Sequence, residues 1–241
     1  MRAILPLLPL TLNDVVFEAA SRRVIDGISL TLDRGARTII LGPNGAGKSV
    51  LLRLCHGLLH PTSGEVRWNS AEIADSPRRQ AMVFQRPVML RRCALGNVTY
   101  ALKLARVPRA ERQRRAIEAL RKVGLEAIGD SSARVLSGGE QQRLALARVW
   151  ALHPEILFLD EPTASLDPGA AHEVEKVIEA MHAAGTKIVM VTHNLGQAHR
   201  LGDEILFLHQ GRLVERTPAG RFFKGPASSE AARFLEGELP W

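Results

Sequence analysis

A glycine-rich loop between a strand pattern and a helix pattern constrains the fold of this chain more than any other feature. Residues 37–41 have the apolar character of a buried strand, and residues 49–59 that of a buried helix. Glycines let the backbone between them wrap so closely that consecutive N–H groups point at phosphate oxygens, and the helix adds its positive end. The pattern therefore predicts a loop that binds a polyphosphate. The loop residues are Gly42, Pro43, Asn44, Gly45, Ala46, Gly47, Lys48 and Ser49, with Val50 next in the helix.

Two polar side chains end this loop, and two acids elsewhere complete the chemistry that a triphosphate needs. Lys48 is predicted to neutralise the β- and γ-phosphates, and the Ser49 hydroxyl to bind Mg²⁺. Residues 156–159 predict a buried strand that ends in Asp160 and Glu161, at the sheet edge where the loop also emerges. Asp160 is expected to hold Mg²⁺ through water. Glu161 is expected to polarise the attacking water, because the metal charge keeps one acid ionised while the other acts as a base.

Strand patterns alternate with helix patterns along most of the chain, which predicts an α/β fold with a largely parallel sheet. Ahead of the loop, residues 11–17 and 24–32 have the apolar spacing of an antiparallel hairpin. Residues 87–135 are helical in character, and a short helical tail covers residues 218–241. We expect these segments to belong to one domain over residues 1–241. The clearest helix, 109–123, has an apolar face made of Ala116, Ile117, Leu120 and Val123.

Composition excludes several classes of protein. No run of about 18 apolar residues occurs, so no membrane-spanning helix is predicted. Residues 1–10 are largely apolar, but two prolines interrupt them and no cleavage site follows, which argues against a signal peptide. Cys55 and Cys93 are too few for a disulfide framework and favour a reducing cytoplasmic setting. The net charge of +7 comes from scattered arginines, with only 5% aromatic residues, which favours a solvated or lipid-facing basic surface over nucleic-acid binding.

A phosphate loop and an acidic strand end are common to kinases, GTPases, helicases and other ATPases, so a further motif has to separate them. Residues 136–143 read Leu-Ser-Gly-Gly-Glu-Gln-Gln-Arg. This segment resembles the signature motif of the ATP-binding cassette (ABC) family, with glutamate at the fifth position. Physically it is a second anion cradle, in which the Ser137 hydroxyl and the Gly138 and Gly139 amides open a helix over residues 140–152.

Other segments match the family's remaining motifs in the proper order. Gln85, after the strand pattern 81–84, resembles the glutamine that touches magnesium and the attacking water. His193, after the strand pattern 187–191, resembles the histidine that hydrogen-bonds the γ-phosphate, and residues 164–167 resemble the loop that crosses the dimer interface. Phe17 is a candidate for the aromatic ring that stacks on adenine. A core position for this phenylalanine is the alternative interpretation.

The resemblance implies a P-loop NTPase fold with a RecA-like core, an N-terminal antiparallel β subdomain and an inserted helical subdomain at 87–135. It also implies a catalytic ATPase with ATP and Mg²⁺ as cofactors. In the family two copies pair head to tail, so that Ser137, Gly138 and Gly139 of one copy contact ATP on the other. The implied partners are transmembrane permease subunits, which would dock at residues 86–93, and an extracytoplasmic substrate-binding protein. The implied location is the cytoplasmic face of the inner membrane.

The cargo and direction of transport stay open at this point. A single cassette without membrane spans resembles bacterial importers, and residues 84–92 resemble cassettes for tungstate, molybdate or related oxyanions. An exporter or lipoprotein-release cassette is an alternative. A non-transport cassette ATPase acting on DNA or ribosomes is disfavoured, because no long coiled coil or second cassette is present. A small-molecule kinase would leave residues 136–143 without a role.

Overall fold

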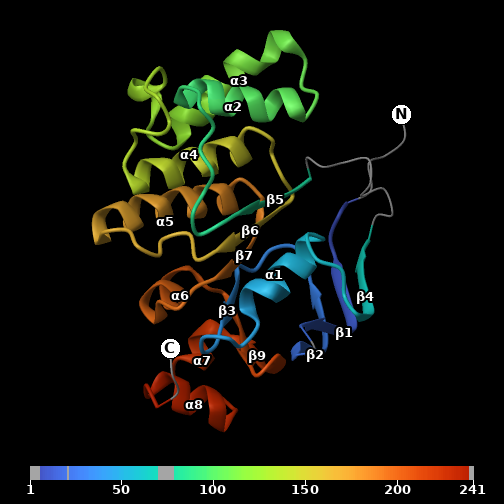
Figure 1. Ribbon diagram of the computed structural model, residues 1–241. Coiled ribbons are helices and arrows are strands. Elements are labelled where there is room, and N and C mark those ends of the chain that lie inside the picture. Colours follow the sequence, from blue (N-terminus) through green and yellow to red (C-terminus); the bar gives the residue numbers. More distant parts are fainter. Residues whose placement is uncertain (1–5, 21, 70–78, 239–241) are drawn as a thin grey trace. The chain divides into compact units, whose positions relative to one another are not determined.

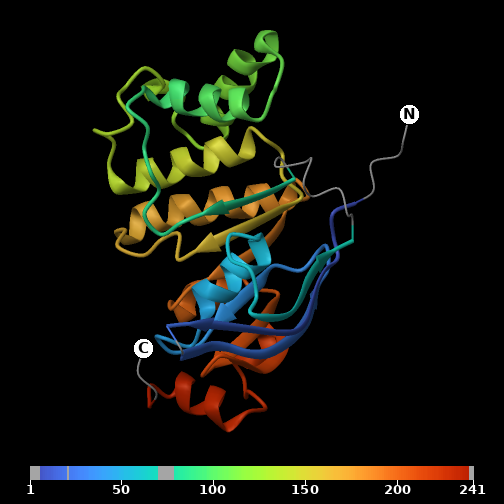
Figure 2. The ribbon, with the colours of Figure 1, turned by 45° about the vertical axis from the view of Figure 1, so that its right-hand side comes forward.

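The computed structural model describes residues 6–20, 22–69 and 79–238, which fall into two compact units. The first unit combines residues 1–76 and 187–241, and the second is residues 77–186. Figures 1 and 2 show the elements of both units in two views. Residues 1–5, the first half of the apolar segment 1–10, lie outside the described residues. Within the described ranges, no helix combines the length and the apolar character needed to cross a membrane.

The first unit begins with an antiparallel three-stranded sheet in the order β2-β1-β4. Its strands are β1 (Leu10–Ala19), β2 (Arg22–Leu32) and β4 (Ser63–Trp68). Alternate apolar residues of β1 are buried, as expected of a sheet with one covered face. The hairpin predicted from residues 11–17 and 24–32 is therefore confirmed, with longer strands than the apolar pattern indicated.

A second set of strands in this unit carries the phosphate loop. The strands are β7 (Lys187–Val191), β3 (Thr38–Leu41), β8 (Glu204–His209) and β9 (Arg212–Pro218). β3 pairs in parallel with both β7 and β8, and β9 pairs antiparallel to β8. All residues of β3 and β7 are buried, because parallel strands are covered on both faces. The carboxyl ends of three parallel strands therefore share one edge, where the phosphate loop begins.

The helices of the first unit are α1 (Lys48–His56), α6 (Leu195–Leu201), α7 (Ala219–Phe222) and α8 (Ser229–Leu235). The tail containing α7 and α8 packs on β8 through aromatic rings. The Phe207 ring lies 6.0 Å from that of Phe222 and 5.3 Å from that of Phe234. The Glu215 carboxylate accepts hydrogen bonds from the Ala227 and Ser228 N–H groups, which fixes the turn before α8.

The second unit pairs two parallel strands with a stack of helices. The strands are β5 (Gln80–Val83) and β6 (Ile156–Asp160), and the helices are α2 (Ala94–Leu104), α3 (Arg109–Lys122), η2 (Glu126–Ile128), α4 (Gly138–Trp150) and α5 (Pro168–Ala183). In both views α4 lies between the α2–α3 pair and α5 (Figures 1 and 2). Its apolar residues are consequently buried along most of its length.

One predicted core position is wrong. The sequence pattern predicts Ile117 on the apolar face of the helix 109–123, but its side chain is 40% exposed. Ala119 is buried in its place, together with Ala116 and Leu120. The spacing of 116, 119, 120 and 123 follows the helical repeat on one face, and residue 117 lies on the flank of that face.

Candidate nucleotide site

The phosphate loop joins the end of β3 to the start of α1, and its glycines adopt backbone angles that other residues rarely take. Gly42, Gly45 and Gly47 have φ of 148°, 75° and 99°. At Gly42 a Cβ atom would lie only 2.0 Å from the carbonyl oxygen of Leu208 on β8. The loop can therefore follow this path only with glycine at its first position.

We expect Gly42→Ala to lower the free energy of unfolding by at least about 2 kcal/mol, because the new methyl group meets a backbone carbonyl. Gly45→Ala is the matched control in the same loop. Its φ is also positive, but nothing lies within 4 Å of its Cβ position, so only the backbone term of about 1 kcal/mol applies. Urea denaturation of both variants measures the difference. Equal losses in the two variants would contradict the role given to the close approach of β8.

Lys48 is held inside the loop. Its side chain is 6% exposed, and Nζ donates hydrogen bonds to the Gly42 and Pro43 carbonyl oxygens at 2.7 and 2.9 Å. The first turn of α1 contains no acid. An ammonium group and the amino end of a helix therefore meet at the centre of the loop, the arrangement that binds phosphate. Ser49 and Val50, the next two residues of α1, are half-buried.

A cavity of about 640 Å³ opens beside the loop, a size typical of ligand pockets. Residues 43–46 of the loop form one wall, the start of β2 forms a second, and the turn between β8 and β9 forms a third. The lining residues outside the loop come from segments far apart in the chain, so no local sequence pattern predicts them. These residues are Arg22, Arg23, Val24, His209, Gln210 and Gly211.

Ion pairs hold one arginine at the mouth of this cavity. Arg23 lies 2.9 Å from the Asp26 carboxylate and 3.4 Å from that of Glu18. Arg212 approaches Asp26 from the β8–β9 side at 2.6 Å. The hydrogen bonds from Arg212 and then Arg23 hold the pKa of the Asp26 carboxyl below its usual range. The wall beside the loop therefore keeps its positive charges in place.

Phe17 lies on β1 directly opposite Ile25 of β2. Opposed residues of an antiparallel pair project from the same face of the sheet. The Ile25 Cδ1 atom would lie 2.8 Å from a Cβ atom on Gly47, so this face is turned toward the phosphate loop. Phe17 is half-buried, which is compatible with a ring that stacks on a base, and its role stays a prediction.

His193 follows β7 at the same edge as the phosphate loop. Ile40 of β3 pairs with Val191 of β7, so Gly42 and His193 each come two residues after a paired position. The His193 side chain is exposed. The next residue, Asn194, caps α6 by accepting a hydrogen bond from the Gln197 N–H at 2.9 Å. The parallel register thus explains why a histidine distant in sequence lies at the loop edge.

In the second unit, the acidic pair and Gln85 lie at one strand edge. Val83 of β5 pairs with Leu159 of β6, so Gln85 and Glu161 each follow by two residues. Asp160 is 6% exposed, Glu161 is half-buried and Gln85 is exposed. Glu161 has a φ of 48°, a left-handed conformation that turns the chain sharply away from the strand.

The signature segment opens α4 through a reciprocal pair of hydrogen bonds. The Ser137 Oγ accepts from the Glu140 N–H at 3.3 Å, and the Ser137 N–H donates to Glu140 Oε2 at 2.8 Å. The Ser137 hydroxyl also donates to Oε2 at 2.8 Å. This hydroxyl bond, the Ser137 N–H and the Arg143 charge together lower the pKa of the Glu140 carboxyl. The two residues form a capping box, which fixes the first turn of the helix.

The glycines of the signature allow α4 to start against residues 166–170. A Cβ atom on Gly139 would lie 2.7 Å from that of Ala170, and one on Gly138 would lie 3.4 Å from Leu166 Cδ2. Ser137 and Gly138 remain exposed. A cavity of about 290 Å³ brings Gly138 together with Gln85 and residues 164–166. Three of the predicted motifs therefore meet within the second unit.

Comparison with known proteins agrees with these features. The family model for ABC transporters matches residues 25–164. The chain is 38% identical over 207 residues to the tungstate uptake system ATP-binding protein TupC of Peptoclostridium acidaminophilum, covering 86% of this chain and 97% of that protein. It is 35% identical over 233 residues to the phosphate import ATP-binding protein PstB 2 of Natronomonas pharaonis, covering 90% and 82%.

A solved structure has the same fold. CbiO1 from Clostridium perfringens, part of the ABC transporter complex CbiONQ, matches with a TM-score of 0.80, 28% identity and 95% coverage of both chains. The mixed α/β architecture with its parallel strands and antiparallel strand subdomain is that of P-loop NTPases. The chain belongs to the ABC transporter family, and it is an ATP-binding transporter subunit that hydrolyses ATP.

Proposed function

We propose that this ATPase powers import through separate membrane-spanning subunits, as a pair of copies arranged head to tail. The observation that carries this proposal is the presence of two anion cradles in one chain. The phosphate loop with Lys48 forms the first, in one unit, and the exposed Ser137 and Gly138 at the start of α4 form the second, in the other. A second copy supplies a nucleotide for the second cradle.

The donor set fits MgATP. Oxygen ligands suit Mg²⁺, and the Ser49 hydroxyl and the Asp160 carboxylate offer them, with Gln85 as a further oxygen donor. Bound Mg²⁺ would neutralise charge that develops on the β- and γ-phosphates. Lys48 binds the same phosphates, and the cavity beside the loop receives the nucleoside. Phe17, which lies on β1 and is not among the residues that line this cavity, is proposed to stack on the base.

Catalysis rests on residues at the strand ends. Glu161 orients the attacking water and accepts its proton. His193 hydrogen-bonds the γ-phosphate and so holds the reacting group in place. Closure of the pair excludes water and completes the site, and reopening after hydrolysis moves the membrane subunits between two states.

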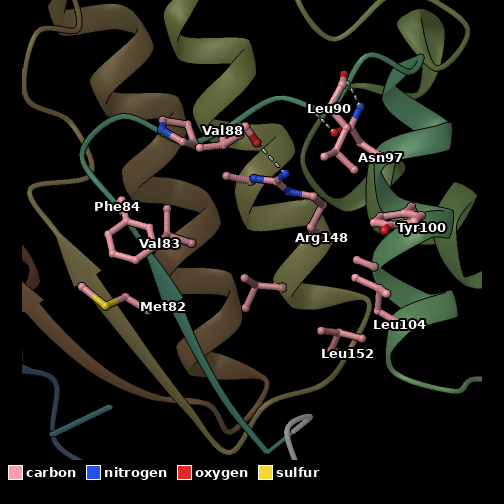
Figure 3. Close-up of a pocket in the computed structure, with 14 residues that line it drawn as sticks. Met82, Val83, Phe84, Val88, Leu90, Asn97, Tyr100, Leu104, Arg148 and Leu152 are labelled. Carbon is pink, nitrogen blue, oxygen red and sulfur yellow. Dashed lines mark hydrogen bonds between the residues drawn. The ribbon is translucent and has the colours of Figure 1, made fainter. Parts of the chain in front are cut away.

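A groove in the second unit is proposed to receive the membrane partner. It has a volume of about 370 Å³ and lies between the end of β5, α2 and α4 (Figure 3). Val88 and Leu104 on its rim are 75% and 65% exposed. Arg148 donates a hydrogen bond to the Val88 carbonyl oxygen at 2.8 Å, and Asn97 Oδ1 accepts one from the Leu90 N–H at 3.1 Å. The groove is therefore apolar and held in shape.

The charges around this groove favour a partner helix with an apolar tip and an acidic flank. The sequence contains no acidic residue between Asp75 and Glu111. Arg86, Arg91 and Arg92 are exposed, and the Arg92 guanidinium lies 4.8 Å from the centre of the Tyr100 ring. Carboxylates on the partner would pair with these arginines.

We expect Leu104→Asp to reduce recovery of the permease subunits at least about tenfold, because a carboxylate on the groove rim loses its water when the apolar helix docks. Co-purification from solubilised membranes, quantified by mass spectrometry, measures this. Ile117→Asp is the matched control, since Ile117 is a 40% exposed apolar residue of the same unit outside the groove. Equal recovery in both variants would contradict docking at this groove.

The same purification tests the transport function itself. Recovery with membrane-spanning subunits, at the cytoplasmic face of the inner membrane, is expected together with a substrate-binding protein. Recovery with ribosomes or DNA would overturn the transport proposal.

We propose an oxyanion as cargo, supported by residues 84–92 and by the similarity to TupC. Cells that lack this chain are expected to lose tungstate uptake, which a transport assay with tungstate measures. If these cells instead lost the export of a substrate, an exporter would be favoured.

A further inference from the structure

In the signature segment, the carboxylate of Glu140 is hydrogen-bonded to Ser137, the serine that is proposed to contact phosphate. Glu140 Oε2 accepts hydrogen bonds from both the hydroxyl and the N–H of Ser137, each at 2.8 Å. Two neighbouring side chains each donate a hydrogen bond elsewhere. Arg143 Nη1 donates to the Val123 carbonyl oxygen at 3.0 Å, and Gln141 Nε2 donates to that of Leu136 at 2.8 Å.

A serine hydroxyl has one proton to donate. An ionised carboxylate accepts hydrogen bonds and donates none, so the Ser137 proton points at Glu140 while this bond lasts. A phosphate oxygen is likewise an acceptor. Ser137 can therefore donate to a phosphate only after its hydroxyl has turned away from Glu140.

We infer that Glu140 competes with the nucleotide of the second copy for the Ser137 hydroxyl, and so sets how readily ATP closes the pair. The inference rests on the head-to-tail pairing proposed above. Glu140 is a positioning residue, because it acts through Ser137. Its negative charge lies one hydroxyl group away from the position that an anionic phosphate takes, and this opposes closure as well.

Glutamine at position 140 would act differently with nearly the same shape. In the place of Glu140 Oε2, which accepts both Ser137 bonds, its amide oxygen can accept the Ser137 N–H and the hydroxyl proton, but a neutral amide oxygen holds that proton less tightly than a carboxylate does. The hydroxyl therefore turns to an anionic phosphate more readily. Since either glutamate or glutamine completes a capping box, Glu140→Gln keeps the start of α4 intact.

The test measures pairing as a function of MgATP in Glu161→Gln protein, whose hydrolysis is blocked, by sedimentation velocity. Adding Glu140→Gln is expected to lower the MgATP concentration at half-maximal pairing about tenfold, the change for one charge-assisted hydrogen bond. In the Ser137→Ala background the same substitution is expected to shift the midpoint less than about threefold, because only the charge effect remains. Glu126→Gln, which removes an exposed acid of the same unit, is expected to leave the midpoint unchanged.

The outcomes separate this inference from the pairing proposal. If Glu161→Gln protein stays monomeric at saturating MgATP, head-to-tail pairing is wrong and the inference is wrong with it. If that protein pairs but Glu140→Gln leaves the midpoint where it was, the competition for Ser137 is wrong on its own. Equal shifts with and without the Ser137 hydroxyl would also overturn it, since they would assign the whole effect to charge.

Discussion

Glu161→Gln is expected to lower ATP turnover by a factor of about 10² to 10⁴ and to leave MgATP binding intact, because the amide can still orient water but cannot accept its proton. Glu161 follows the buried strand β6, in a left-handed backbone conformation with a φ of 48°. A side-chain amide of the same size leaves this turn unchanged. Phosphate release measures turnover, and equilibrium binding of a fluorescent ATP analogue measures affinity.

The matched control for this prediction is Glu173→Gln. Glu173 is an exposed acid of α5 in the same unit, and its carboxylate lies 2.8 Å from Lys176 Nζ. A surface pair of this kind contributes little, so turnover in this variant should equal that of the parent protein. Undiminished turnover in Glu161→Gln would mean that another group accepts the proton of the attacking water.

The strand and loop of the phosphate site could be predicted because their sequence pattern is local. A run of apolar residues that is buried on both faces, followed by glycines and a lysine, is compatible with few local structures other than a strand and a phosphate-binding loop. The pattern predicts a strand at 37–41, and the strand lies at Thr38–Leu41. The hairpin 11–17 with 24–32 is confirmed for the same reason, since alternate apolar residues mark its covered face.

The residues that line a cavity, and the exposure of single side chains, depend on contacts between distant segments, so local sequence patterns do not predict them. Arg22 and His209 line the same cavity although 187 positions separate them in sequence, because β8 pairs with β3 and β2 passes the loop. The exposure of Ile117 depends on which helices cover α3. The pattern predicts that the signature helix starts at residue 140, but it starts at Gly138, because Ser137 caps it by accepting a hydrogen bond from the Glu140 N–H of the first turn.

Lys48→Ala is expected to weaken MgATP binding by a factor of about 30 to 1,000, the range for removing one partner of a buried charge pair. Lys48 is 6% exposed and its ammonium group donates hydrogen bonds to two loop carbonyls, so a bound phosphate would meet it with little water between them. Isothermal titration with MgATP measures the affinity directly. Because a ligand that binds the folded state raises its stability, MgATP should also raise the melting temperature of the parent protein and not that of the variant.

Lys176→Ala separates this effect from a general loss of positive charge. Lys176 is an exposed lysine paired with Glu173 at 2.8 Å, so its removal should leave MgATP affinity unchanged. Lys48→Ala also frees the Gly42 and Pro43 carbonyl oxygens, which are then open to water at the loop. Melting of both variants without nucleotide shows whether the loop survives. A folded Lys48→Ala protein that binds MgATP as tightly as the parent would remove Lys48 from its assigned role, because the backbone N–H groups of the loop alone would then account for binding.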